Sequence, residues 1–472
     1  MVWRSGESLV TYGVSFIVGI VLARLLDPAD FGLIAMVEVF IAIGATFADS
    51  GFTNALIRKK ERSPVDYSTV YVTNVVISAV FAVILFLVAG LIANFYHQPI
   101  LQKIVRFNAL ILFLSSFLAV QSARLTIQLD FKTRGIINVV AGITTGIASI
   151  ILALLGYGVW ALLYPAFFAL LVKALLFWHY QHWFPGFSFS WKTWREFFNY
   201  GSKLLASGLL DTVYGYIYPL VIGKKFSATD LGFYTKAESY SRLPATVSTS
   251  VLSNVTFPVL ARVQDDDEAL QRMYRRLISL SAFVVFPILM GLCALAKPFI
   301  TCLITEKWSQ SVIYLQILCF ALMWYPIHAL NLNLLQVKGR SDLFLKLEII
   351  KKILGVAILV VTIPLGLVYM CAGRIVSSVI CLVINTHYTG KLIQIGFLKQ
   401  MRDIAPSFAY SVAMGLTVWF VIRPIPSLWG QLFVGVPVGA LLYVGLAKLM
   451  RSPELSYLMQ LVKDNFPGHG KK

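Results

Sequence analysis

Residues 235–256, TKAESYSRLPATVSTSVLSNVT, decide how the whole chain is interpreted, because they stand where a membrane-spanning segment is expected and are unusually polar. Their polar side chains recur at the helical spacing of three or four residues. The members of this stripe are Glu238, Arg242, Thr246, Thr249, Ser253 and Thr256. Polar groups in the hydrocarbon layer are tolerated only against protein or a water-filled cavity. The stripe therefore predicts an aqueous chamber inside a helix bundle.

Composition places the 472-residue chain among multi-pass membrane proteins. It is 58% hydrophobic and 13% charged, with a mean hydropathy of +0.77, which is too apolar for a soluble core. The net charge of +18 is explained by basic cytoplasmic loops, so we expect no nucleic-acid partner. No P-loop, GxGxxG, HExxH or CxxC motif is present, and we therefore expect no cofactor and no metal.

Apolar segments of about 20 residues, the length that crosses a bilayer, predict an all-α polytopic protein with about 14 transmembrane helices. The expected spans are 5–25, 31–50, 69–93, 104–121, 135–155, 159–180, 200–222, 235–256, 277–296, 310–332, 347–365, 367–388, 404–422 and 430–448. If the N-terminus is cytoplasmic, most of the 40 Lys and Arg residues fall in cytoplasmic loops. The excess of Lys and Arg on the cytoplasmic side holds only if 235–256 crosses the membrane. The resulting topology predicts that both termini are cytoplasmic.

An internal repeat appears at an offset of 200 residues. The sequence ARLLDPADFGLIAMVEVF begins at Ala23, and GKKFSATDLGFYTKAESY begins at Gly223. The alignment pairs Asp30 with Asp230, Gly32 with Gly232 and Glu38 with Glu238. An even number of expected spans separates the two copies, so the halves should share one orientation, related by an axis along the membrane normal.

Several stretches together resemble one known family. They are LARLLDPADFGLIAM (22–36), FADSGF (47–52), the stretch beginning LDFKTRGIINVV (129–140), LVIGKKFSATDLGFYTKA (220–237) and FPVLARVQDDDE (257–268). This combination resembles the polysaccharide transporter family, the Wzx-type flippases of the multidrug/oligosaccharidyl-lipid/polysaccharide superfamily. The resemblance covers roughly residues 1–400.

The resemblance implies a fold of two pseudo-symmetric six-helix lobes that form a V around a central cavity, as in MATE-like proteins, with two additional C-terminal helices. The corresponding parts of this chain are an N-terminal lobe (1–180), a cytoplasmic linker (181–199), a C-terminal lobe (200–390), two further transmembrane helices (404–448) and a cytoplasmic tail (449–472). In such folds the first two helices of each lobe line the cavity. Here they are 5–25, 31–50, 200–222 and 235–256.

The resemblance also implies a flippase, not an enzyme, that moves undecaprenyl-diphosphate-linked oligosaccharide across the bacterial inner membrane for lipopolysaccharide, capsule or exopolysaccharide assembly. The expected partners are the lipid-linked oligosaccharide, membrane lipids, and polysaccharide polymerase and assembly proteins. One departure from the family is Tyr218-Pro219, where members often carry Asp-Asn, so a cavity acid is not carried over to that position.

Ionisable residues inside apolar segments are the candidate functional residues, because each is costly to expose to lipid. As substrate contacts we expect Arg242, Lys236, Arg374 and Asp211, and for ion coupling Glu38 and Glu238. The i,i+4 pair of Glu238 and Arg242 leaves two readings open, a salt bridge that permits burial and a contact with substrate. Arg374 and Asp211 pair with each other or with another helix. Pro244 lacks an amide hydrogen and predicts a kink or hinge.

Two other functions are alternatives to a flippase. A cation-coupled multidrug exporter of the same superfamily would favour an acid-dominated chamber, whereas these candidates mix acids and bases. A membrane polymerase or ligase would need a catalytic constellation, usually on a sizeable loop, and the expected outer loops are short. The charges alone do not decide between flippase and exporter, but the family resemblance favours the flippase.

Overall fold

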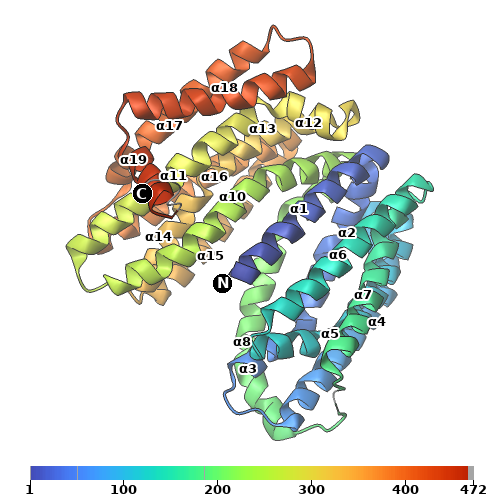
Figure 1. Ribbon diagram of the computed structural model, residues 1–472. Coiled ribbons are helices and arrows are strands. Elements are labelled where there is room, and N and C mark those ends of the chain that lie inside the picture. Colours follow the sequence, from blue (N-terminus) through green and yellow to red (C-terminus); the bar gives the residue numbers. More distant parts are fainter. Residues whose placement is uncertain (1, 50, 185, 466–472) are drawn as a thin grey trace, which may run out of the picture. The chain divides into compact units, whose positions relative to one another are not determined.

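The computed structural model describes the backbone of residues 2–49, 51–184 and 186–465, and the side chains of residues 10–49, 51–184, 186–249 and 256–460. Every regular element in this part of the chain is helical (Figure 1). The helices form two compact units, residues 1–235 and 236–472, and the division falls inside one long helix, α10. Each unit is described by itself. The expected division into lobes around 181–199 follows from counting spans and stays a prediction.

The helices of the first unit are α1 (Val2–Leu25), α2 (Pro28–Asp49), α3 (Phe52–Arg58), α4 (Pro64–Tyr96), α5 (Ile100–Ile127), α6 (Phe131–Leu154), α7 (Trp160–Gln181), α8 (Trp191–Gly215), α9 (Ile217–Lys225) and the start of α10 (Ala228–Arg262). The second unit continues with α11 (Asp267–Ala294), α12 (Ala296–Ile304), η1 (Glu306–Trp308), α13 (Ser311–Leu322), α14 (Tyr325–Val337), α15 (Ser341–Thr362), η2 (Ile363–Leu365), α16 (Leu367–Ile393), α17 (Phe397–Ile422), α18 (Leu428–Leu449) and α19 (Pro453–Asn465).

Ten of the expected spans fall on helical segments that are long and apolar enough to cross a membrane, counted over the described residues. The bent pair α8–α9, with an angle of 41°, would make eleven. The other three, 5–25, 235–256 and 347–365, are helical but do not meet that standard. α10 and α15 carry several charges, and of α1 only the part from Val10 to Leu25 lies among the residues whose side chains are described. The chain is thus a multi-pass membrane protein, and fourteen spans and the side of each terminus stay predictions.

Apolar side chains on the outside of the helices fit a lipid environment. On α4, Leu87 and Leu91 are 73% and 69% exposed, and similar residues recur along the other apolar helices. In water such surfaces would drive aggregation. In a bilayer they need no cover, because lipid chains are as apolar as leucine.

The two copies of the repeat begin their helices in the same way. In α2 the Asp27 amide donates to the Asp30 carboxylate (3.1 Å). In α10 the Ser227 amide donates to the Asp230 carboxylate (3.2 Å), and the Asp230 amide donates to the Ser227 hydroxyl (3.0 Å). Both carboxylates satisfy an amide that the helix leaves unbonded. The two repeat copies, 200 residues apart, therefore match in local structure as well as in sequence.

Gly32 and Gly232, which the repeat pairs, lie against each other's helix. A Cβ at Gly32 would lie 2.6 Å from the Ala228 carbonyl carbon, and a Cβ at Gly232 would lie 2.7 Å from that of Pro28. The starts of α2 and α10 thus cross in reciprocal backbone contact. Only residues without a side chain permit this approach.

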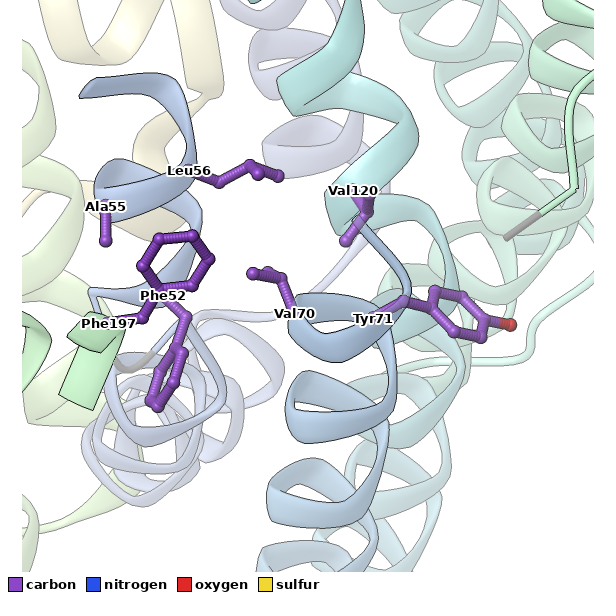
Figure 2. Close-up of a cluster of buried hydrophobic side chains, with 7 residues drawn as sticks. All are labelled: Phe52, Ala55, Leu56, Val70, Tyr71, Val120 and Phe197. Atoms are coloured by element: carbon purple, nitrogen blue, oxygen red, sulfur yellow. The ribbon is translucent and has the colours of Figure 1, made fainter. Parts of the chain in front are cut away.

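A buried cluster holds α8 to the first unit (Figure 2). Phe52 and Leu56 of α3 pack with Val70 of α4, Val120 of α5 and Phe197 of α8. The hydroxyl of Tyr71, the one polar atom among the labelled side chains, points away from the cluster in this view. Because α8 is fixed to α3 and α4 in this way, the compact units divide after α9 and not before α8.

In the second unit α11, α17 and α18 share a core. The buried side chains include Phe283, Met414, Val418 and Tyr443. The Tyr443 hydroxyl donates to the Phe283 carbonyl (2.8 Å), so a hydrogen bond joins α18 to α11. These helices are adjacent in Figure 1. This arrangement provides the frame for the C-terminal helix α19.

Candidate functional site

The polar stripe lies on α10, which continues unbroken from Ala228 to Arg262 through Pro244 and Pro258. The stripe hydroxyls bond to the helix itself: Thr246 donates to the Arg242 carbonyl (2.9 Å) and Thr249 to the Ala245 carbonyl (2.7 Å). Hydroxyls satisfied in this way need no water as an acceptor. The charged residues, more than the hydroxyls, make α10 polar. The side chain of Ser253 lies outside the described residues, and the role of Pro244 as a hinge stays a prediction.

Glu238 is paired with Arg374 of α16, at 2.7 Å between Oε1 and Nη1. The two side chains are 17% and 22% exposed, so the pair is only partly buried. Arg374 therefore pairs with another helix, one of the alternatives that the sequence left open. The i,i+4 ion pair of Glu238 with Arg242 is not formed, because the Glu238 carboxylate is directed to α16.

Arg242 is exposed and makes no ion pair with a described residue. A guanidinium without a neutralising carboxylate can pair with an anion. Lys236, two residues before Glu238, has its ammonium 5.8 Å from the ring centre of the buried Trp308. A cation near an aromatic face is stabilised by the ring electrons. The second unit therefore carries Lys236, Glu238 and Arg242 on one helix, with Arg374 paired to Glu238.

Glu38 and Asp211 lie in the first unit, on α2 and α8, and both are exposed. The two helices run antiparallel, since Gly51 lies beside Gly201 and Thr46 bonds to Thr212 (3.0 Å). Asp211 is thus level with Thr46, eight residues from Glu38, or about 12 Å along the helix. The two acids do not form a carboxylate pair. Their roles in coupling and substrate contact stay predictions.

A buried polar network in the second unit was missed by the sequence analysis. Thr389 donates to Asn331 Oδ1 (2.6 Å), and Asn331 Nδ2 donates to Gln400 Oε1 (3.0 Å). Beside it, Asn385 Nδ2 lies 3.2 Å from His328 Nδ1. The spacing of Asn385 and Thr389 by one helical turn was the signal that could have revealed this face.

His328 of α14 contacts two side chains of α16. Its Nδ1 lies 3.2 Å from Asn385 Nδ2, and its Nε2 lies 3.0 Å from the Ser378 hydroxyl. The serine in turn donates to the Ala321 carbonyl (3.2 Å). These bonds join α14 to α16 and α16 to α13, while Asn385 Oδ1 is buried without a hydrogen-bond partner in the described part of the chain. The role of these bonds is to specify packing.

A polar cavity of about 370 Å³ lies among α1, α6 and α7 of the first unit. Thr11, Asn138, Thr145 and Lys173 line it. None of the predicted site residues does. Among the described residues, no group of three or more His, Cys, Asp or Glu could hold a metal ion.

Two solved structures share the fold. The lipid II flippase MurJ, in an inward closed conformation, superposes with a TM-score of 0.75, covering 94% of this chain and 98% of MurJ at 14% identity. An inward-facing MATE family multidrug resistance transporter of the MOP superfamily gives 0.64, covering 81% and 95% at 15% identity. At these identities the likeness shows the fold alone.

Sequence relatives lie in polysaccharide biosynthesis. The lipopolysaccharide biosynthesis protein WzxC of Escherichia coli (strain K12) is 27% identical over 76% of this chain and 73% of its own length. The teichuronic acid biosynthesis protein TuaB of Bacillus subtilis (strain 168) is 25% identical over 86% and 88%. The succinoglycan biosynthesis transport protein ExoT of Rhizobium meliloti (strain 1021) is 22% identical over 98% and 95%.

A family model described as "Polysaccharide biosynthesis protein" matches residues 21–313. This range includes the start of α2, the repeat and all of α10. The expected resemblance to polysaccharide transporters is confirmed by this match and by the relatives. Since the match extends over more than half of the sequence, the chain belongs to the polysaccharide biosynthesis protein family.

Proposed function

We propose that this protein translocates a lipid-linked oligosaccharide across a bacterial inner membrane and does not catalyse a reaction. The observation that carries a transport role is α10, which bears Lys236, Glu238 and Arg242 in a largely apolar helical protein. The substrate class is supported by family membership and by relatives named for polysaccharide synthesis and transport. The proposed architecture is two six-helix lobes with two further helices and cytoplasmic termini.

In the proposed substrate a diphosphate joins a polyprenol to the sugar, and this charge must pass through the bilayer interior. The protein then has to replace the water that the phosphates lose. Arg242 suits this role because a guanidinium stays ionised when buried and forms bidentate bonds to phosphate oxygens. It is exposed and forms no ion pair with the described residues.

Arg374 is the second proposed phosphate contact. In the structure Glu238 neutralises it across 2.7 Å. A phosphate that competes for Arg374 would release the Glu238 carboxylate to bind a proton or a cation. The ion pair thus offers a direct link between substrate binding and ion coupling. Glu38, the repeat partner of Glu238, is the proposed second coupling site.

The test uses a strain in which the gene is deleted. Loss of surface polysaccharide together with accumulation of its lipid-linked repeat unit is the expected phenotype. Complementation with Arg242→Ala should lower export roughly tenfold or more, because one or two charge-assisted bonds to phosphate are lost. Arg242→Lys should retain part of the activity, since the charge remains without the planar fork.

Two results would contradict this function. An Arg242→Ala protein that is present at normal levels and restores full export would remove the arginine from the substrate path. A deletion strain with intact polysaccharide and increased sensitivity to cationic drugs would favour a multidrug exporter instead. The amount of membrane-inserted protein is measured in every strain, so that a folding defect is separated from a transport defect.

A further inference from the structure

A second cavity, of about 950 Å³, lies in the second unit away from the candidate site. The first turns of α11 and α17 form two of its walls, and the junction of α18 with α19 forms the third. Four arginines line it, and we call it the arginine pocket: Arg272, Arg275, Arg276 and Arg402. None of the residues proposed for transport takes part.

Two of the four arginines are already engaged. Arg275 makes a bidentate pair with Asp403 of α17, at 2.7 Å and 2.5 Å. The Arg276 guanidinium lies 3.6 Å from the ring centre of Tyr457, which places α19 against α11 (Figure 1). These contacts order the walls of the pocket. They also fix the position of the remaining charges.

Arg272 and Arg402 make no ion pair with any carboxylate among the described residues. The other acids of the lining are Glu268 and Glu454, and Glu454 accepts a bond from the Ser452 hydroxyl (2.6 Å) at the start of α19. The lining as a whole therefore carries an excess of positive charge. Two unpaired guanidinium groups in a concave site are the arrangement that binds phosphate.

The pocket changes from polar to apolar along the helices that form it. α11 and α17 run in the same direction, because Arg275 bonds to Asp403 and Met290, fifteen residues on, lies against Gly415. On α17 the lining residues Arg402, Pro406 and Tyr410 follow one another by single turns. On α11 the arginines likewise precede Leu280. The charged end lies at the helix starts and the apolar end toward the spanning part.

We propose that the arginine pocket binds the phosphate-bearing headgroup of a membrane lipid, with Arg272 and Arg402 on the phosphate and the lipid chain along Leu280 and Tyr410. Only an amphiphile matches a basic end and an apolar end in this order. The loops at the basic end, 257–276 and 389–403, are those predicted to be cytoplasmic, and the cytoplasmic leaflet holds anionic lipids. This binding does not depend on the transport proposed above.

Two lipids share this chemistry, an anionic glycerophospholipid and a polyprenyl diphosphate. Purified full-length protein in neutral detergent is titrated with phosphatidylglycerol, undecaprenyl diphosphate, phosphatidylcholine or inorganic phosphate, and bound ligand is counted by native mass spectrometry. The test variant is Arg272→Ala/Arg402→Ala. The matched control is Arg340→Ala, an exposed arginine on the same predicted side that is bonded to Asp342 and lies outside the pocket.

Phosphatidylglycerol should bind the wild type and the Arg340→Ala control equally, and the double variant at least tenfold more weakly. That result assigns the pocket to glycerophospholipids. If only undecaprenyl diphosphate binds the double variant at least tenfold more weakly than the wild type, the pocket is assigned to the carrier lipid. The proposal is overturned if both lipids bind the double variant as tightly as the wild type, or if inorganic phosphate binds the wild type as tightly as both lipids do. Circular dichroism and monodisperse elution establish that the double variant is folded, and Arg272→Lys/Arg402→Lys should recover part of the binding if it is not.

Discussion

Replacement of Gly232 by alanine should destabilise the protein through the backbone contact between α2 and α10. The added Cβ would overlap the Pro28 carbonyl oxygen, its nearest neighbour, and would lie 2.7 Å from the Pro28 carbonyl carbon and 3.2 Å from the Pro28 Cα. Carbon atoms in favourable contact are about 3.5–4.0 Å apart, so the overlap with the carbonyl carbon is roughly 1 Å. The neighbour is backbone and cannot turn away as a side chain would. We therefore expect a cost near the upper end of the usual overpacking range, about 3 kcal/mol.

The matched control is Gly445→Ala on α18. A Cβ there meets nothing within 4 Å, and the residue is exposed. Alanine in a helix is favoured over glycine by roughly 0.5–1 kcal/mol, so the control should be neutral or slightly stabilised. Gly32→Ala should behave like Gly232→Ala, because its Cβ would meet the Ala228 backbone in the same way. The double variant should cost less than the sum, since the two substitutions separate the same pair of helices.

The assay is thermal unfolding in detergent at a fixed scan rate, followed by tryptophan fluorescence, which covers the first unit where this contact lies, and by a thiol-reactive dye. Several free cysteines, among them Cys319 and Cys371, are fully buried and react only when the second unit opens, while tryptophan fluorescence reports on both units. A loss of about 3 kcal/mol should lower the apparent Tm by roughly 6–12 °C for a unit of this size. If Gly232→Ala and Gly445→Ala unfold at the same temperature, the reciprocal contact does not contribute to stability and the reasoning is wrong.

Three further predictions follow from the helix arrangement. Cysteine-accessibility mapping should place the loops 257–276 and 51–68 on the same side of the membrane; opposite sides would mean that α10 does not cross. Tyr443→Phe should cost about 1 kcal/mol in chemical denaturation, because the Phe283 carbonyl loses its donor; an unchanged midpoint would show that this bond is not a net contributor. Glu238→Gln should abolish the ion dependence of transport in reconstituted vesicles with little loss of folded protein; wild-type transport that ignores both proton and sodium gradients would remove the basis for coupling.

The helices themselves were predictable from the sequence. An apolar segment of bilayer length is a local signal, because it depends on the hydrogen bonds and lipid contacts of one helix. The repeat was also visible in the sequence. Glycine recurs at Gly32 and Gly232 because the two helix backbones approach so closely there that a side chain does not fit. The family could be recognised because two of its motifs, 22–36 and 220–237, include these helix starts.

The tertiary structure decided which charges meet. Glu238 has a basic residue one turn away at Arg242, and local spacing favours that pair, yet the carboxylate bonds to Arg374 of a helix more than a hundred residues later. Spacing describes one helix only, whereas a partly buried charge takes the partner that neighbouring helices bring within hydrogen-bond distance.

The arginine pocket shows the same limit of sequence. Arg272 and Arg402 lie in separate basic loops that, read along the chain, indicate only the cytoplasmic side. They line one cavity because α11 and α17 pack in parallel and α19 folds back against α11. Sequence by itself thus determined the helices, their polarity and the family. The tertiary structure decided which side chains line one cavity, because this depends on packing between helices that are distant in sequence. Such packing leaves no periodic signal in any one segment.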